Sequence, residues 1–156
     1  MGSTGVILQK RDNVDLKKAI EDIKVAAGRA NLKIILSGRI EKCEFEGNFS
    51  TIVNLANKFD NSDDEQQLLL YVYSQGEKDY LDEFDWIRKD GHLIQSINIE
   101  DISGCEEILL SFLYEYMSLN PDVVFWDEYQ WAYYYSDVVR IKNKEFDELW
   151  CYKKPQ

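Results

Sequence analysis

Carboxylate side chains are the groups in this sequence that could most directly carry out acid–base chemistry. It contains 29 Asp and Glu residues but a single histidine, His92. Two carboxylates that face each other can act as general acid and base, as they do in glycoside hydrolysis. With so many acidic residues, close pairs also arise by chance, so their abundance does not single out a catalytic pair. A small carboxylate-dependent hydrolase is therefore the least favoured of three candidate functions.

Other patterns that carry chemistry are missing from the sequence. It has neither glycine-rich phosphate-binding motif, G-x-x-x-x-G-K-[ST] or G-x-G-x-x-G, and no G-x-S-x-G motif. The acidic stretch 60–65 fails as a calcium loop, because Glu65 stands where an EF-hand requires glycine. Cys43, Cys105 and Cys151 lack the spacing of a metal or redox pair, so we expect buried free thiols. We expect no catalytic residue, no cofactor and no bound metal.

Negative charge is concentrated in the middle of the sequence. The formal net charge is −11. Residues 1–59 carry +3 (10 basic, 7 acidic), residues 60–107 carry −11 (3 basic, 14 acidic) and residues 108–156 carry −3 (5 basic, 8 acidic). Such a segment can steer a basic partner and speed its association, although charged runs often serve only to solvate a surface. Direct nucleic-acid binding is not expected, because no basic stripe is present.

Aromatic residues are interleaved with the carboxylates in two segments. Residues 79–86 hold four carboxylates and three aromatic rings, a mixture typical of binding hot spots. Residues 126–131 show a similar mixture, although most aromatic residues of the C-terminal third are expected in the core. We expect a basic protein partner to contact these residues: Asp63, Asp64, Glu65, Asp79, Tyr80, Asp82, Glu83, Asp85, Trp86, Trp126, Asp127 and Glu128.

Apolar patterns in the first part of the chain predict the elements that would position these residues. Residues 1–5 are expected to be a flexible tail, followed by a first strand at 6–8. Helical spacing of apolar residues predicts a helix over 15–28 with Asn13 as its N-cap.

The next apolar runs are shorter. Strands are expected at 32–36 and 39–46, joined by a turn at Ser37-Gly38. An apolar stripe at helical spacing predicts a second helix over 49–59.

Strand and hairpin signals follow in the middle of the chain. The continuous apolar run 68–73 predicts a buried central strand. The dipeptide Asp90-Gly91 favours the tight turn of a β-hairpin near residues 86–97, with His92 expected at the surface.

The last long pattern is helical. It predicts a helix that begins near Ser103, has Glu106 in a capping box and ends at Asn120-Pro121. The predicted fold is α+β: one domain over residues 1–156, in which a mixed or antiparallel sheet packs against about three helices.

The chain also resembles a known class of bacterial proteins. The segment 112–121, followed by Phe125-Trp126, Ser136-Asp137 and residues 150–154, is similar in style to immunity proteins of polymorphic-toxin and contact-dependent growth-inhibition systems. The resemblance implies a non-catalytic protein that binds a cognate toxin, commonly a basic nuclease, and occludes its active site. Its carboxylates would then take the place of nucleic-acid phosphates opposite the toxin's Lys and Arg residues.

Two alternatives remain open besides an immunity protein. A nucleic-acid mimic would inhibit many DNA-binding enzymes rather than one toxin, whereas a hydrolase would need a deep pocket with two or more carboxylates. In all three cases we expect a cytoplasmic protein, because the sequence has no apolar run of membrane-spanning length and no signal-peptide pattern.

Overall fold

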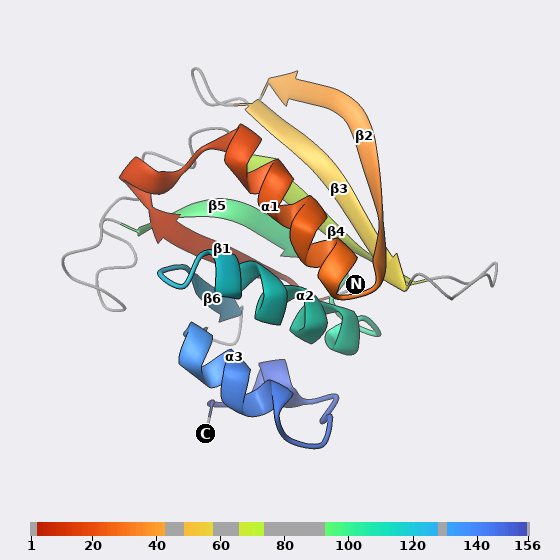
Figure 1. Cartoon of the computed structure of the whole chain (residues 1–156), viewed down its shortest axis with the longest axis vertical. Helices are drawn as coiled ribbons and strands as arrows, with labels where there is room; N and C mark the ends of the chain where they lie inside the picture. The colour runs from red at the N-terminus through yellow and green to blue at the C-terminus, as the bar shows by residue number, and fades with distance from the viewer. Residues whose placement is uncertain (1–2, 43–48, 58–65, 74–92, 128–130, 156) are drawn as a thin grey trace.

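Seven strands form one sheet in the order β2-β3-β4-β5-β1-β6-β7. The computed structural model describes residues 3–42, 49–57, 66–73, 93–127 and 131–155 (Figure 1). Within these ranges the elements are β1 (Gly5–Lys10), the 3-10 helix η1 (Arg11–Asn13), α1 (Leu16–Arg29), β2 (Leu32–Lys42), β3 (Phe49–Asn57), β4 (Gln67–Tyr73), β5 (Leu93–Glu100), α2 (Glu106–Leu119), β6 (Val124–Asp127), β7 (Ala132–Tyr133), α3 (Tyr135–Lys142) and the 3-10 helix η3 (Trp150–Tyr152).

The predicted α+β class is confirmed. All strand pairs in the described ranges are antiparallel, and three α-helices accompany the sheet. The first arm of the hairpin predicted near 86–97 lies outside the described residues, while its second arm is β5. None of the described helices combines the length and the apolar character that crossing a membrane requires.

The helices lie together on one face of the sheet. Figure 1 shows α1 and α2 side by side over the strands, with α3 beyond α2. The core between the layers includes Ile7, Leu70 and Ile97 from the sheet, and Ile23 from α1 and Phe112 from α2, all fully buried. Burial of this apolar face is the main driving force that holds the layers together.

Helix α1 confirms the predicted helix but begins after a different cap. Asp15, not Asn13, is the N-cap: its Oδ1 accepts hydrogen bonds from the backbone N–H groups of Lys17 (3.0 Å) and Lys18 (3.3 Å). Capping of this kind satisfies N–H groups that have no partner within the helix. The chain then leaves the helix through Asn31, whose φ of 56° is a left-handed conformation common after helix ends.

The helix predicted over 49–59 is wrong, because the segment forms strand β3. Val53 and Leu55 are buried in the core, while Ile52 before them and Asn54 between them are half-buried, so burial alternates over residues 52–55 as in a strand. A short apolar run is compatible with both the helical and the strand periodicity. Pairing with β2 on one side and β4 on the other stabilises the strand here.

The turn predicted at Ser37-Gly38 is also absent, and β2 continues through these residues. Leu36 pairs with Val53 and Ile40 pairs with Thr51, so residues 37–39 lie opposite one residue of β3. The glycine therefore lies in a strand irregularity, which is one of the few places where a strand tolerates glycine well.

Strand β5 contains a bulge at Ser96. Ile7 of β1 pairs with Ile97, whereas Leu8 pairs with Gln95, so Ser96 is the extra residue. Its Oγ donates a hydrogen bond of 3.2 Å to the backbone oxygen of Ile7. The bulge reverses the facing of the side chains along β5, so Leu93 packs with Leu8 in a second apolar cluster instead of in the main core.

Residues 3–5 belong to the fold, in contrast to the expected tail at 1–5, of which residues 1 and 2 lie outside the described residues. Ser3 is buried, its backbone oxygen accepts from the Ile102 N–H at 3.1 Å, and its Oγ lies 3.1 Å from the Tyr152 hydroxyl. Gly5 already pairs with Ile99 in the sheet. The two ends of the chain are thus tied to the start of α2.

An aromatic cluster closes the C-terminal part of the core. The ring of Phe125 lies 5.8 Å from that of Tyr133 and 6.2 Å from that of Trp150, centroid to centroid. All three side chains are buried, as expected for most of these aromatic residues. The Phe125 ring also lies directly over Gly5, where a β-carbon would approach its ring atoms to 2.6 and 2.7 Å.

We predict that Gly5→Ala lowers the free energy of unfolding by about 1–3 kcal/mol, because the added methyl group overpacks the aromatic cluster. Gly28→Ala is the matched control: a β-carbon there meets nothing within 4 Å, and the helix should gain about 0.5 kcal/mol. Urea unfolding monitored by tryptophan fluorescence measures both. Equal stability of the two variants would contradict the packing of Phe125 over Gly5.

Candidate functional site

Ten of the twelve residues expected to contact a partner lie outside the described residues, as do His92 and Cys43. Their role in binding therefore stays a prediction. The two that the structure describes, Trp126 and Asp127, belong to strand β6.

Both β6 residues are integrated into the fold. Trp126 is half-buried and packs against the second apolar cluster, next to Leu8 and Val124. Asp127 is only 2% exposed, and its Oδ1 accepts a hydrogen bond of 3.2 Å from the backbone N–H of Trp131. The Asp127 N–H donates in turn to the Trp131 oxygen at 3.1 Å. Asp127 therefore holds the β6–β7 connection together and is not a surface charge of the kind expected from the sequence.

We predict that Asp127→Ala lowers the free energy of unfolding by about 1–3 kcal/mol, because it leaves the Trp131 N–H without its acceptor. Asp127→Asn keeps an acceptor oxygen and should lose less stability. Thermal unfolding distinguishes the two variants. A full loss of partner affinity in Asp127→Ala with unchanged stability would instead restore Asp127 to the interface.

The described part of the central acidic segment carries a uniform charge. Residues 66–73 and 93–107 contain four charged side chains, and all four are carboxylates. They gather where β5 ends and α2 begins, and we call this group the acidic corner: Glu100, Asp101, Glu106 and Glu107. The helix N-terminus carries a partial positive charge, which favours carboxylates at this position.

The four carboxylates of the acidic corner have different surroundings. Asp101 and Glu107 are exposed, and Asp101 adopts a left-handed φ of 61°. Glu106 is held in place: its Oε1 accepts from the Gly104 N–H at 3.2 Å and from the Tyr152 hydroxyl at 3.0 Å. Glu106 is the first residue of α2 and does not form the predicted capping box with Ser103, since Cys105 is the N-cap.

Burial suppresses ionisation of the groups beneath the acidic corner. It raises the pKa of the Tyr152 hydroxyl to about 12, so this group keeps its proton and donates a hydrogen bond to Glu106. It likewise raises the pKa of Cys105 to about 11, helped by the charges of Glu106 and Asp101, and that of Cys151 to about 12. Both thiols are free and buried, which confirms the prediction for these two cysteines.

We predict that Cys105 and Cys151 react with a disulfide reagent at pH 7.5 only when the protein unfolds. A shift from 9.0 to about 11 lowers the thiolate fraction of Cys105 about a hundredfold, and the thiolate is the nucleophile. Because the folded state holds these protons more tightly, stability should fall as the pH rises above 9.

The measurement is the rate of thiol labelling in Cys43→Ser with and without urea, together with unfolding curves at pH 7, 9 and 10. Rapid labelling of two thiols in the folded variant would contradict the burial of these cysteines.

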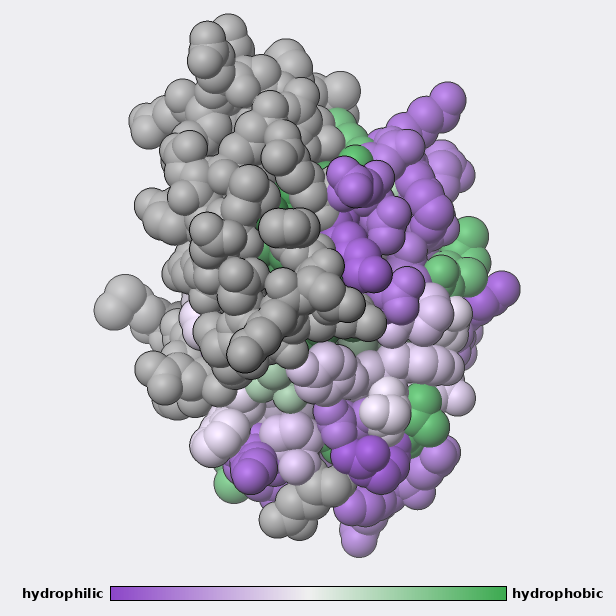
Figure 2. Space-filling view, turned by 90° about the vertical axis from the view of Figure 1, so that its left-hand side faces the viewer, coloured by the Kyte–Doolittle hydropathy of each residue, from purple (hydrophilic) through white to green (hydrophobic). Residues whose placement is uncertain are grey.

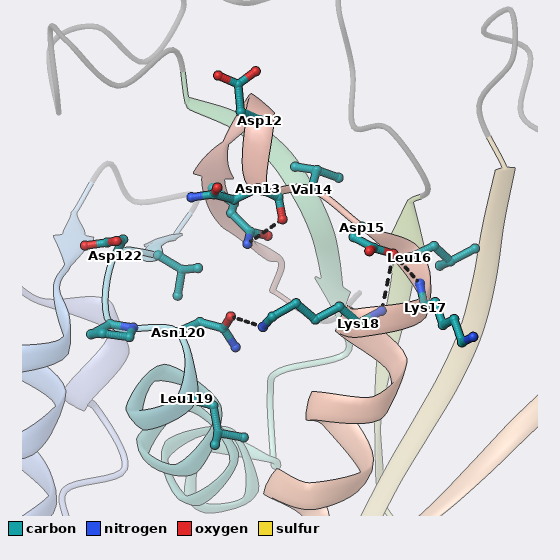
Figure 3. Close-up of a pocket in the computed structure, with 13 residues that line it drawn as sticks. Asp12, Asn13, Val14, Asp15, Leu16, Lys17, Lys18, Leu119, Asn120 and Asp122 are labelled. Atoms are coloured by element: carbon teal, nitrogen blue, oxygen red, sulfur yellow. Dashed lines mark hydrogen bonds between the residues drawn. The ribbon is translucent and has the colours of Figure 1, made fainter.

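The opposite end of α2 borders an open groove of about 890 Å³. One wall is formed by η1 and the start of α1, and the other by the end of α2 and the loop to β6 (Figure 3). We call it the α1–α2 groove. Its lining consists of Gln9, Asp12, Asn13, Val14, Asp15, Leu16, Lys17, Lys18, Leu119, Asn120, Pro121, Asp122 and Val123.

A polar network connects the two walls of the α1–α2 groove. The Lys18 ammonium lies 2.5 Å from Asp22 Oδ2 and donates to Asn120 Oδ1 at 2.9 Å. Asn120 Nδ2 donates to the same Asp22 oxygen at 3.1 Å and to the backbone oxygen of Tyr116 at 3.3 Å. Lys18 therefore crosses the groove with its charge already neutralised by Asp22.

The rest of the groove combines acidic, amide and apolar groups. Asp12 and Asp122 are exposed on the two walls, and Figure 3 shows their carboxylates directed outward, away from Lys18 and Asn120. Figure 2 shows one side of the molecule, and the described surface there is mostly hydrophilic with isolated hydrophobic residues. The sequence pattern around residue 15 revealed the helix start but gave no sign of a groove, because the second wall comes from residues about a hundred positions away.

Comparisons with known proteins identify no relative. No family model matches the chain, and neither the curated proteins nor the solved structures contain a match. In the described ranges no group of three or more His, Cys, Asp and Glu residues is arranged to hold a metal ion.

Proposed function

We propose that this protein is an inhibitor of the immunity type, which binds a basic protein toxin through an acidic surface and blocks its active site. One observation carries the proposal: residues 60–107 hold a net charge of −11, and the described part of that segment presents all its charges as carboxylates at the acidic corner.

The geometry of the acidic corner suits this role. Asp101 and Glu107 are exposed, while Glu106 is fixed by bonds from Tyr152 and from Trp150, whose Nε1 donates to the Glu106 backbone oxygen at 2.9 Å. A rigid surface of one charge sign attracts a basic partner over several ångströms and loses little entropy on binding. In this proposal the residues of 79–86 contact the same partner, with Trp86 as the aromatic anchor of the interface.

The proposed partner is a single cognate toxin, such as a nuclease, met in the bacterial cytoplasm. The proposal includes no cofactor, no membrane contact and no direct binding of nucleic acid. An inhibitor that mimics nucleic acid is the alternative with the same electrostatics, and the range of enzymes inhibited separates the two.

Co-expression with the product of the adjacent upstream gene tests the proposal. Rescue of growth from a toxic neighbour, with a complex that co-purifies, is the expected result. A harmless neighbour that does not co-purify would overturn the proposal, and inhibition of several unrelated DNA-binding enzymes would favour the nucleic-acid mimic.

We predict that the double variant Asp101→Asn/Glu107→Gln slows association with the toxin about three- to tenfold at low salt and flattens the salt dependence. Asparagine suits position 101 because it tolerates the left-handed backbone. The matched control is Glu145→Gln/Glu148→Gln, which removes two exposed carboxylates from the segment after α3. Stopped-flow mixing at low and at physiological salt gives both rates.

A second variant tests the segment that the structure does not describe. Alanine at Asp79, Asp82, Glu83 and Asp85 should weaken binding and flatten its salt dependence further. If both variants associate with the toxin like the wild type, the interface lies neither at the acidic corner nor in the segment 79–86.

A further inference from the structure

The sheet has one long edge that no described element covers. Its two end strands are β2 and β7. Strand β7 has only two residues, and the chain enters α3 directly afterwards at Tyr135. Strand β2 has 11 residues, pairs with β3 alone, and lies at the rim of the sheet in Figure 1. Within the described ranges the outer backbone groups of β2 have no strand partner, so they can pair with another strand.

The first half of this edge is apolar on both faces of the sheet. Leu32 and Ile34 pack with the core that lies under α1. Ile35 points to the other face, because side chains alternate along a strand, and it is 47% exposed. Strand edges that avoid pairing usually carry charges or proline, whereas Lys33 is the single charge in the run 32–36. An exposed isoleucine in an uncovered edge strand therefore favours the addition of a further strand.

The sequence of β2 is complementary to itself in an antiparallel register centred on Ser37. This register sets Ile34 opposite Ile40 of a second copy, and Lys33 opposite Glu41. The pairing with β3 shows that the two isoleucine positions share one face of the sheet, and that the lysine and glutamate positions share the other.

Each facing pair therefore lies on the same face of the extended sheet, as strand pairing requires. Apolar pairs and pairs of opposite charge directly across two strands are stabilising. The irregular stretch 37–39 lies on the two-fold axis of this register, so the regular arms 32–36 and 40–42 remain aligned with those of the second copy.

The distribution of charge favours a second copy over a basic toxin at this edge. Residues 1–59, which include β2, carry +3, so the edge offers no net negative charge to a basic protein. The acidic corner lies at the end of β5, three strands inward from β2, which is about 14 Å at the usual strand spacing. Two acidic corners in a β2–β2 pair are then roughly 30 Å apart, and salt with a Debye length of about 8 Å largely screens their repulsion.

We propose that two copies of this chain pair through β2 in an antiparallel, two-fold dimer. The two seven-stranded sheets then form one continuous sheet, and each acidic corner stays well away from the pairing edge. This inference goes beyond the proposed function and can be tested without a toxin.

Sedimentation velocity of the full-length protein over about 5–300 µM tests the dimer, because this range covers the affinity expected for a modest interface. A reversible dimer is the expected result. Hydrogen exchange at a low and a high concentration locates the interface, and the backbone amides of 32–36 and 40–42 should exchange more slowly at the high concentration. A protein that stays monomeric throughout, or a dimer without this protection in β2, overturns the proposal.

One pair of variants tests the edge. Ile35→Lys adds a charge of the kind that blocks edge pairing and should weaken the dimer at least about tenfold. Val25→Lys is the matched control, because it makes the same kind of change at a side chain of similar exposure (42%) on α1. Tryptophan fluorescence and urea unfolding show whether both variants keep the fold. Equal dimerisation of Ile35→Lys and the wild type, or an equal loss in both variants, contradicts pairing through β2.

A charge reversal tests the register. Glu41→Lys sets like charges opposite each other and should weaken the dimer about three- to tenfold. Adding Lys33→Glu to this variant makes the facing charges opposite again and should restore the affinity. If the double variant dimerises as weakly as Glu41→Lys alone, the antiparallel register centred on Ser37 is wrong.

Discussion

Burial of helix α2 is the interaction on which the rest of the structure depends. Its inner face packs Leu109, Phe112 and Leu113 into the core between α1, α3 and the sheet. At its N-terminus Trp150 and Tyr152 bind Glu106, and at its C-terminus Asn120 joins Lys18 and Asp22 of α1. Both candidate surfaces lie at the ends of this helix, so their geometry follows from how its ends are held.

The two ends of α2 differ in the charged groups that surround them. At the acidic corner the partial positive charge of the helix N-terminus favours carboxylates and offsets part of their mutual repulsion. At the α1–α2 groove the Lys18 ammonium is paired with Asp22 and Asn120, and the other charged residues of the lining are Asp12, Asp15, Asp122 and Lys17. Beneath the acidic corner, burial raises the pKa of the Cys105 and Cys151 thiols and of the Tyr152 hydroxyl, so these groups keep their protons in the folded protein at neutral pH.

Particular elements show why part of this arrangement could be predicted and part could not. Helix α1 and helix α2 have long amphipathic or apolar patterns with clear ends, and both were predicted close to their observed limits. The segment 49–57 is short and fits both a helix and a strand, so its neighbours β2 and β4 decide its structure. Asp127 resembles a surface charge in the sequence, yet the backbone of Trp131 binds its carboxylate inside the fold.

The sequence by itself determined the α+β class, the long helices, the central strand β4, the free thiols at Cys105 and Cys151, and the separation of charge along the chain, because composition and periodicity are local properties. Only the tertiary structure decided the strand order, the bulge at Ser96, the burial of Asp127 and the α1–α2 groove. Each of these depends on contacts between elements that the sheet and its helices bring together. Such contacts form only when the strands have paired and the helices pack on the sheet.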